Sequence, residues 1–194
     1  MEMKDIFKEK PFYSKQELDG MGFSWYQIKK LIENGILEKL NSHVYESNIY
    51  EDIVNDFNYV SVFIPEGVIC KLSAANYYGY TNFMPRKIDV AVPCDKKINK
   101  LPDYPLIKLC YPRGSRYSSG IIVINSKLDS FKIYSKEKTV CDILIHKTKI
   151  DVEEIKNVLT GYLNDKDRNL NKLYELAVEL KCEKTLRTYL EVLL

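Results

Sequence analysis

Residues 14–47 constrain the fold more than any other segment, because they contain two helix starts of the same kind. Ser14 and Ser24 are each followed, three positions later, by Glu or Gln. This is the spacing of a capping box, in which the serine and the later side chain each bond a free backbone N–H. The spacing predicts a short helix beginning near Lys15 and a second one ending at Gly35, a residue type that favours helix ends.

The second predicted helix has two chemically different faces at about 100° per residue. The apolar face, expected in the core, holds Trp25, Ile28, Leu31 and Ile32. The opposite face holds Tyr26, Gln27, Lys30 and Asn34, with Lys29 on its flank. Side chains of this second set bond base edges and phosphates when a helix lies in a major groove.

A hairpin is predicted after the second helix. Residues 36–40 and 43–45 read as two strands around a two-residue turn, Asn41-Ser42, with Lys39 and His43 near the tip. A helix, a turn, a helix and a hairpin follow one another in a winged helix-turn-helix, which binds DNA through its second helix. We therefore predict a DNA-binding domain over 1–50. The expected contacts to phosphates or the minor groove from the hairpin are Lys39, Asn41, Ser42 and His43.

Charge gives this prediction mixed support. Residues 1–50 carry seven lysines and eight acids, whereas a DNA-binding domain usually has a basic excess. The lysines of the second helix and of the hairpin lie where the contacts are expected, and most acids lie earlier in the chain. A helical hairpin that never touches DNA stays open as the alternative.

Residues 51–194 predict a second, larger α+β domain with a small sheet and a helical C-terminal tail. Helices are expected over 53–64, around 73–75, over 136–146, 152–163 and 170–180, and from 183. Strands are expected over 87–92, 106–111, 120–125 and 131–134. This part is net +3, and its basic excess gathers between about 70 and 116. A possible patch for DNA or for antitoxin action comprises Lys71, Arg86, Lys87, Arg113 and Arg116. A solvated lysine-rich face is the simpler interpretation.

The sequence contains no strong catalytic motif. No glycine-rich phosphate loop follows a strand, and the five widely spaced cysteines predict reduced core residues, so we expect no cofactor and no metal. A nuclease using Asp89 with Lys108 is the strongest enzyme alternative, but it lacks a second nearby acid. No apolar run would span a membrane, and the charged amino terminus does not resemble a secretory signal. We expect a cytoplasmic protein that is not an enzyme.

The order of three segments resembles a known family. These are "LSAANYYGYTNFMPRKIDVAVP" (72–93), "YSKEKTVCDILIH" (134–146) and "KTLRTYLEVLL" (184–194), all following the predicted winged helix. Together they resemble the AbiEi-like antitoxins of type IV toxin–antitoxin systems. Two positions depart from the family pattern: Lys138 stands where arginine is usual, and Tyr78 where many members have histidine. Thr139 and Asp142 within the second segment are interpreted as packing residues.

The resemblance implies a function. In that family the winged helix binds repeats in its own promoter and represses the operon, and the C-terminal domain carries the antitoxin activity. The neighbouring gene encodes a nucleotidyltransferase-like toxin, which the antitoxin need not contact, and the pair acts in abortive infection against phage. A transcription factor whose second domain senses a small ligand fits the same architecture and stays open.

Overall fold

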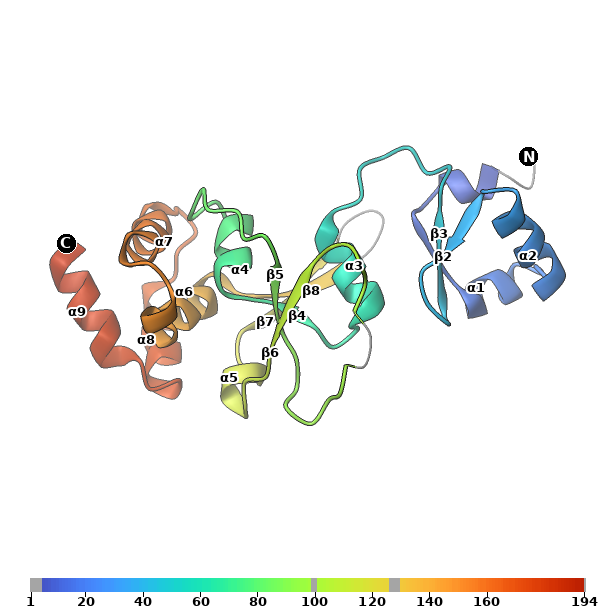
Figure 1. The fold of residues 1–194 in the computed structure, drawn as a ribbon. Coiled ribbons are helices and arrows are strands. Elements are labelled where there is room, and N and C mark those ends of the chain that lie inside the picture. Colours follow the sequence, from blue (N-terminus) through green and yellow to red (C-terminus); the bar gives the residue numbers. More distant parts are fainter. Residues whose placement is uncertain (1–4, 99–100, 126–129, 194) are drawn as a thin grey trace.

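The chain forms two units, which Figure 1 shows joined by an extended segment. The structure is a computed structural model, and it describes residues 5–98, 101–125 and 130–193. The smaller, N-terminal unit contains η1 (Asp5–Lys8), β1 (Phe12–Ser14), α1 (Lys15–Gly20), α2 (Trp25–Glu33), β2 (Leu37–Lys39) and β3 (Val44–Ser47). The mixed α+β class expected from the sequence is confirmed.

Both predicted capping boxes are present. The backbone N–H of Glu17 donates to Ser14 Oγ, and the Glu17 carboxylate accepts from the Ser14 N–H. Ser24 and Gln27 repeat this exchange at the start of α2. Because each box satisfies two N–H groups that a helix start leaves free, two short helices can form close together in the chain.

The strands of this unit differ from the prediction in two ways. β1 was not predicted, and it completes a three-stranded antiparallel sheet in the order β1-β3-β2. The predicted two-residue turn is wrong, because β2 ends at Lys39 and β3 begins at Val44. The Asn41 side chain shapes the longer connection by accepting from the N–H groups of His43 (2.8 Å) and Val44 (3.0 Å). A side chain that bonds the backbone two and three residues onward stabilises a wider turn.

Trp25 is not in the core, so its predicted place on the buried face is wrong. Its side chain is 67% exposed, whereas Ile28 and Leu31 on the same helix are buried. The core position is taken by Phe23, which precedes the capping serine and packs on Phe7 with ring centroids 5.5 Å apart. Phe23 and Ile28 stand at the two positions of a hydrophobic staple, which fixes how the chain enters the helix. Trp25, the first residue of α2, is left outside.

The larger unit is built on a five-stranded mixed sheet. Its strands, in the spatial order β6-β5-β4-β8-β7, are β4 (Val68–Ile69), β5 (Ile88–Ala91), β6 (Ile107–Cys110), β7 (Ile121–Asn125) and β8 (Ser130–Tyr134). Its helical segments are α3 (Asp56–Phe63), α4 (Lys71–Tyr77), α5 (Ser115–Ser118), α6 (Lys136–Ile145), η2 (Lys147–Lys149), α7 (Val152–Asn164), α8 (Leu170–Glu179) and α9 (Glu183–Leu193). Among the helices of the described ranges, none is long and apolar enough to cross a membrane.

The start of α3 and the presence of β4 differ from the prediction. The helix expected from residue 53 begins at Asp56, because the Asn55 side chain caps it by accepting from the Phe57 N–H at 2.9 Å. Ile53 therefore lies in the connecting segment and is 95% exposed. β4, which was not predicted, lies between β5 and β8, with an antiparallel neighbour on one side and a parallel neighbour on the other.

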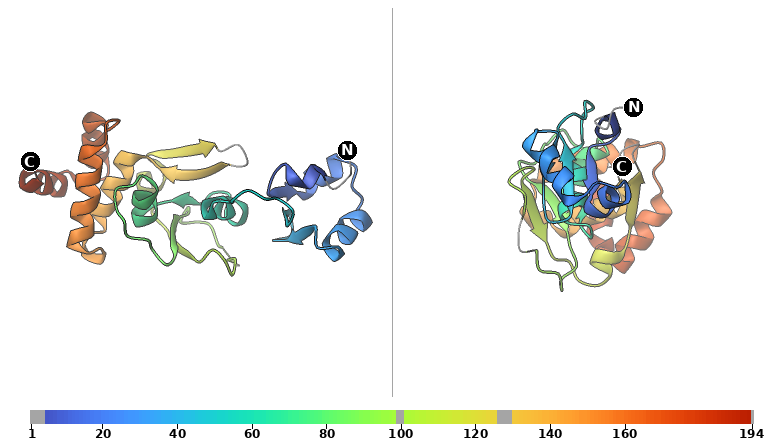
Figure 2. Two further views of the ribbon diagram at one scale, coloured as in Figure 1. Left: turned by 90° about the horizontal axis from the view of Figure 1, so that it is seen from above. Right: turned by 90° about the vertical axis from the view of Figure 1, so that its right-hand side faces the viewer.

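The sheet buries both faces. Ile88 and Val90 of β5 join a cluster with Val60 of α3 and Ile64, which follows α3, whereas Ala91 joins a separate cluster on the other face. Successive strand residues point to opposite faces, so β5 contributes to both. Helices α6 to α9 form a third core beside the sheet, and Figure 2 shows α9 at the end of the molecule opposite the N-terminal unit.

The two units meet at α3. The ring of Tyr59 packs edge-on against Phe12 with centroids 5.1 Å apart, and its hydroxyl donates to the Glu46 carboxylate. Burial and this carboxylate raise the pKa of Tyr59. The Asn41 amide also donates to the Val62 carbonyl at 3.4 Å. The connection between the units is thus reinforced by polar and aromatic contacts outside the linking segment.

Candidate nucleic-acid interface

Two aromatic rings and two lysines form an exposed surface on α2, which we call the α2 face (Trp25, Tyr26, Lys29 and Lys30). Tyr26 is 63% exposed, close to the exposure of Trp25. Lys29 Nζ lies 5.8 Å from the Trp25 ring centroid, and Lys30 Nζ lies 4.9 Å from that of Tyr26. Exposed lysines held over aromatic rings combine positive charge with flat apolar surface, which is the chemistry of phosphate and base contacts.

Lys29 and Lys30 differ in their partners. Lys29 Nζ also lies 3.6 Å from Glu33 one turn along the helix, an exposed ion pair of small energetic value. Lys30 takes part in none of the ion pairs within the described residues. Of the two, Lys30 is therefore the one whose charge is more available to a phosphate.

The Gln27 side chain takes part in capping the start of α2. Its carbonyl oxygen accepts from both the N–H and the hydroxyl of Ser24, each at 2.8 Å. A bidentate contact with adenine needs the amide oxygen and the amide nitrogen together. Gln27 can make that contact only by giving up the cap, so its expected role in base reading competes with its role in folding.

The remaining predicted contact residues are spread over two places. Asn34 is exposed at the C-terminal end of α2, where its backbone N–H closes the last turn. Lys39, Ser42 and His43 are exposed around the β2–β3 connection, while Asn41 is half-buried and bonded within the turn. The His43 carbonyl accepts from the Lys15 N–H at 2.7 Å, so this connection lies beside the start of α1.

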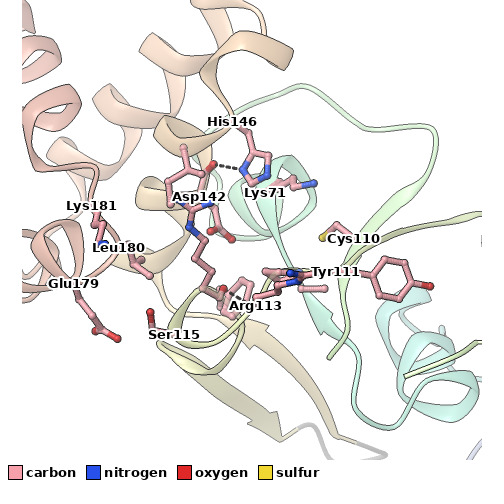
Figure 3. Close-up of a pocket in the computed structure, with 15 residues that line it drawn as sticks. Lys71, Cys110, Tyr111, Arg113, Ser115, Asp142, His146, Glu179, Leu180 and Lys181 are labelled. Carbon is pink, nitrogen blue, oxygen red and sulfur yellow. Dashed lines mark hydrogen bonds between the residues drawn. The ribbon is translucent and has the colours of Figure 1, made fainter. Parts of the chain in front are cut away.

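The five basic residues of the predicted patch in the second unit lie in two places. Lys71, Arg113 and Arg116 line one pocket, which Figure 3 shows in close-up. Arg86 and Lys87 are exposed and precede β5, whose other end contributes Ala91 to that pocket. The structure therefore brings three of the five together and places the other two at the far end of the strand.

Asp89 and Lys108, the pair considered for a nuclease, are register partners on the parallel strands β5 and β6. Asp89 is buried, and burial raises the pKa of its carboxyl against the opposing effect of Lys71 and Lys108. Within the described ranges no group of three His, Cys, Asp or Glu residues could hold a metal ion.

The segments that carry the family resemblance bond to one another inside the second unit. Ser73 Oγ accepts from the Asp89 N–H at 2.9 Å, which ties α4 to β5. The Tyr78 hydroxyl donates to the Tyr134 carbonyl at 2.7 Å, which ties α4 to the end of β8. Thr139 donates to the same carbonyl at 3.3 Å. These side chains hold the sheet and helices together, as packing residues do.

Trp25 is the residue of the α2 face that the sequence did not assign to the interface. A signal was available, because Trp25 directly follows the capping serine and adjoins Tyr26. Consecutive residues of a helix lie about 100° apart, so Trp25 and Tyr26 can lie on the same solvent-facing half of α2.

Comparisons with known proteins bear on the fold. No protein-family model matches the chain, and no curated protein matches its sequence. The fold is similar to that of the Rv2827c protein from Mycobacterium tuberculosis, with a TM-score of 0.50 and 13% sequence identity. The alignment covers 91% of this chain and 72% of that protein. At this identity the similarity concerns the arrangement of helices and strands alone.

Proposed function

We propose that this chain is a cytoplasmic, non-enzymatic DNA-binding protein whose N-terminal unit acts as a winged helix-turn-helix. The observation that carries the proposal is the α2 face, where two lysines lie over two exposed aromatic rings. α2 is the second helix of the pair, the one that enters the major groove in domains of this class. The β2–β3 connection, with Lys39 and His43 exposed, would serve as the wing.

The contacts divide into two kinds. Lys29 and Lys30 would bind phosphates and determine affinity and salt dependence. Tyr26 and Asn34 would face base edges, with Gln27 joining them only where it leaves its cap. Because few cations are involved, we expect modest affinity and a shallow dependence of that affinity on salt.

We further propose that the bound DNA is the chain's own promoter and that the chain is a type IV antitoxin. This part rests on the sequence resemblance of residues 72–93, 134–146 and 184–194 to the AbiEi-like family. The second unit would then counteract a nucleotidyltransferase-like toxin encoded next to it, with no requirement for direct contact.

A mobility-shift titration tests the DNA-binding proposal. Purified full-length chain is titrated against its own upstream DNA and against scrambled DNA of equal length, at two salt concentrations. We expect tighter binding to the upstream DNA at both salts and weaker binding to either DNA at the higher salt. Equal affinity for the two DNAs would refute specific promoter recognition.

Antitoxin action needs a separate test. The neighbouring gene is expressed in bacteria alone, with this chain, or with this chain lacking residues 5–49. We expect the toxic effect on growth to be relieved by the full chain and, because the activity is assigned to the second unit, by the truncated chain where it accumulates. Persistent toxicity with abundant full-length chain would contradict the antitoxin proposal and leave the DNA-binding proposal intact.

A further inference from the structure

A pocket of about 590 Å³ lies in the second unit, on the side of the sheet away from α3. Its walls come from segments that are far apart in the chain: the start of α4, the ends of β5 and β6, the α5 loop, α6, and the junction of α8 with α9. Figure 3 labels side chains from each of these segments except β5 around the pocket. The volume lies within the range of about 300–1,000 Å³ that is usual for small-molecule sites.

The pocket carries unbalanced positive charge. Four cations line it, namely Lys71, Arg113, Arg116 and Lys181. In the described part of the chain none of the four forms an ion pair. The two lining carboxylates are already engaged, Asp142 by Lys138 and Glu179 by the Ser119 hydroxyl. Cations that outnumber the carboxylates of a concave site favour an anionic ligand.

Backbone strain coincides with this pocket. Among the described residues, two that are not glycine have a left-handed backbone, Lys71 at φ 50° and Lys181 at φ 61°. Both are lysines and both line the pocket. A non-glycine residue in this conformation costs roughly 1–2 kcal/mol, and such strain clusters at functional sites. The fold therefore tolerates an unfavourable conformation at two lysines that line the pocket.

We propose that the pocket binds a small phosphate-bearing anion of about mononucleotide size. Arginine forks bind phosphate oxygens in pairs, and lysine adds point charges. Ile145, Leu180 and Pro112 supply apolar lining for an organic group attached to the phosphate. The phosphates of a DNA duplex do not fit this description, because Lys71 is half-buried within the recess and a duplex is convex.

The test is calorimetric titration of the full chain at constant ionic strength with three probes: ATP, inorganic pyrophosphate and adenosine. We expect saturable binding of ATP and pyrophosphate, and binding of adenosine at least tenfold weaker. Arg113→Ala should weaken ATP binding at least tenfold. Arg86→Ala is the matched control, since Arg86 is an exposed arginine outside the pocket, and it should leave ATP affinity unchanged.

Three results of the calorimetric titrations would overturn the proposal. These are no saturable binding of ATP or pyrophosphate, equal binding of adenosine, or equal losses in Arg113→Ala and Arg86→Ala. Displacement of bound ATP by a DNA duplex, with loss of DNA binding in Arg113→Ala, would also overturn it in favour of DNA. The proposal is independent of the α2 face, so Lys30→Ala should bind ATP as the unsubstituted chain does.

Discussion

The two units present lysine in opposite ways. On the α2 face the lysines lie on a convex, well-capped helix, with their ammonium groups over exposed rings. In the pocket, Lys71 and Lys181 lie in a hollow and have strained backbones. A convex charged surface can follow a long polyanion, whereas a hollow selects a ligand small enough to enter it. Shape and strain, and not the number of charges, separate the two kinds of site.

The largest expected difference between the units concerns a third lysine. Lys138 is fully buried under the pocket, where its ammonium group bonds Asp142 and lies 4.3 Å from the Tyr134 ring centroid. Lys138→Ala leaves a buried carboxylate without its partner and should lower the free energy of unfolding by about 3–5 kcal/mol. Lys30→Ala, on the exposed α2 face, should change it by less than about 0.5 kcal/mol.

Urea unfolding of the two variants measures this difference. Replacing both partners, Lys138→Met with Asp142→Leu, should recover much of the loss, because neither charge of this pair is then left buried without its partner. Similar small effects of Lys138→Ala and Lys30→Ala would mean that the Lys138 pair is not buried as the structure has it.

A smaller effect is expected at the junction of the units. Tyr59→Phe removes the hydroxyl that donates to Glu46, and a hydrogen bond to a charged group contributes about 1.5–3 kcal/mol. Loosened contact should expose the connecting segment, so cleavage after Glu51 by a glutamate-specific protease should be faster. Tyr50→Phe is the control, because its hydroxyl bonds Asp52 on the exposed surface at 3.2 Å. Equal cleavage rates in the two variants would contradict the role of Tyr59.

A still smaller loss of stability is expected when the cap at the start of α2 is removed. Ser24→Ala removes the hydroxyl of the capping box and should cost about 1 kcal/mol. Trp25 is the one tryptophan of the chain, so its fluorescence reports unfolding of this unit. Ser42→Ala, at an exposed serine of the β2–β3 connection, should leave the transition unchanged. A transition in Ser24→Ala that matches Ser42→Ala would show that the cap does not hold α2.

The smallest expected effect is an increase in the free energy of unfolding, whereas the preceding substitutions lower it. Lys181→Gly relieves a left-handed backbone just after α8 and should raise the free energy of unfolding by about 0.5–1 kcal/mol. Lys184→Gly, at an exposed position in the first turn of α9, should lower it by up to about 1 kcal/mol. Thermal unfolding of both variants shows whether each substitution raises or lowers the free energy of unfolding. Destabilisation by Lys181→Gly would argue against strain at that position.

Elements with strong local signals were predicted well from the sequence. The two capping boxes and the alternating strands β5 to β8 fall where their residues indicated. β1 and β4 were missed because they span three and two residues, too few to show a pattern. These strands form by pairing with strands that are distant in the sequence, and Phe12 of β1, for example, pairs with Glu46 of β3.

The α2 face and the pocket also differ in how far the sequence predicts them. Most of the α2 face could be read from one helix, and the error at Trp25 arose because Phe23 takes the core position next to it. The pocket could not be derived from the sequence, since its lining comes from segments more than a hundred residues apart, such as Lys71 and Lys181. The left-handed backbone of both lysines is likewise set by packing, which a residue type does not reveal.

The central claim is that the α2 face binds the phosphates of DNA, and its most direct test is the salt dependence of DNA affinity. The logarithm of the binding constant is measured against the logarithm of salt concentration for the unsubstituted chain, Lys30→Ala and Lys8→Ala, with Trp25 fluorescence as the signal. Lys30→Ala should weaken binding to every DNA sequence and reduce the slope by about 1. Lys8→Ala, at an exposed lysine paired with Asp5 outside the α2 face, should keep the original slope. An unchanged slope in Lys30→Ala would contradict the claim.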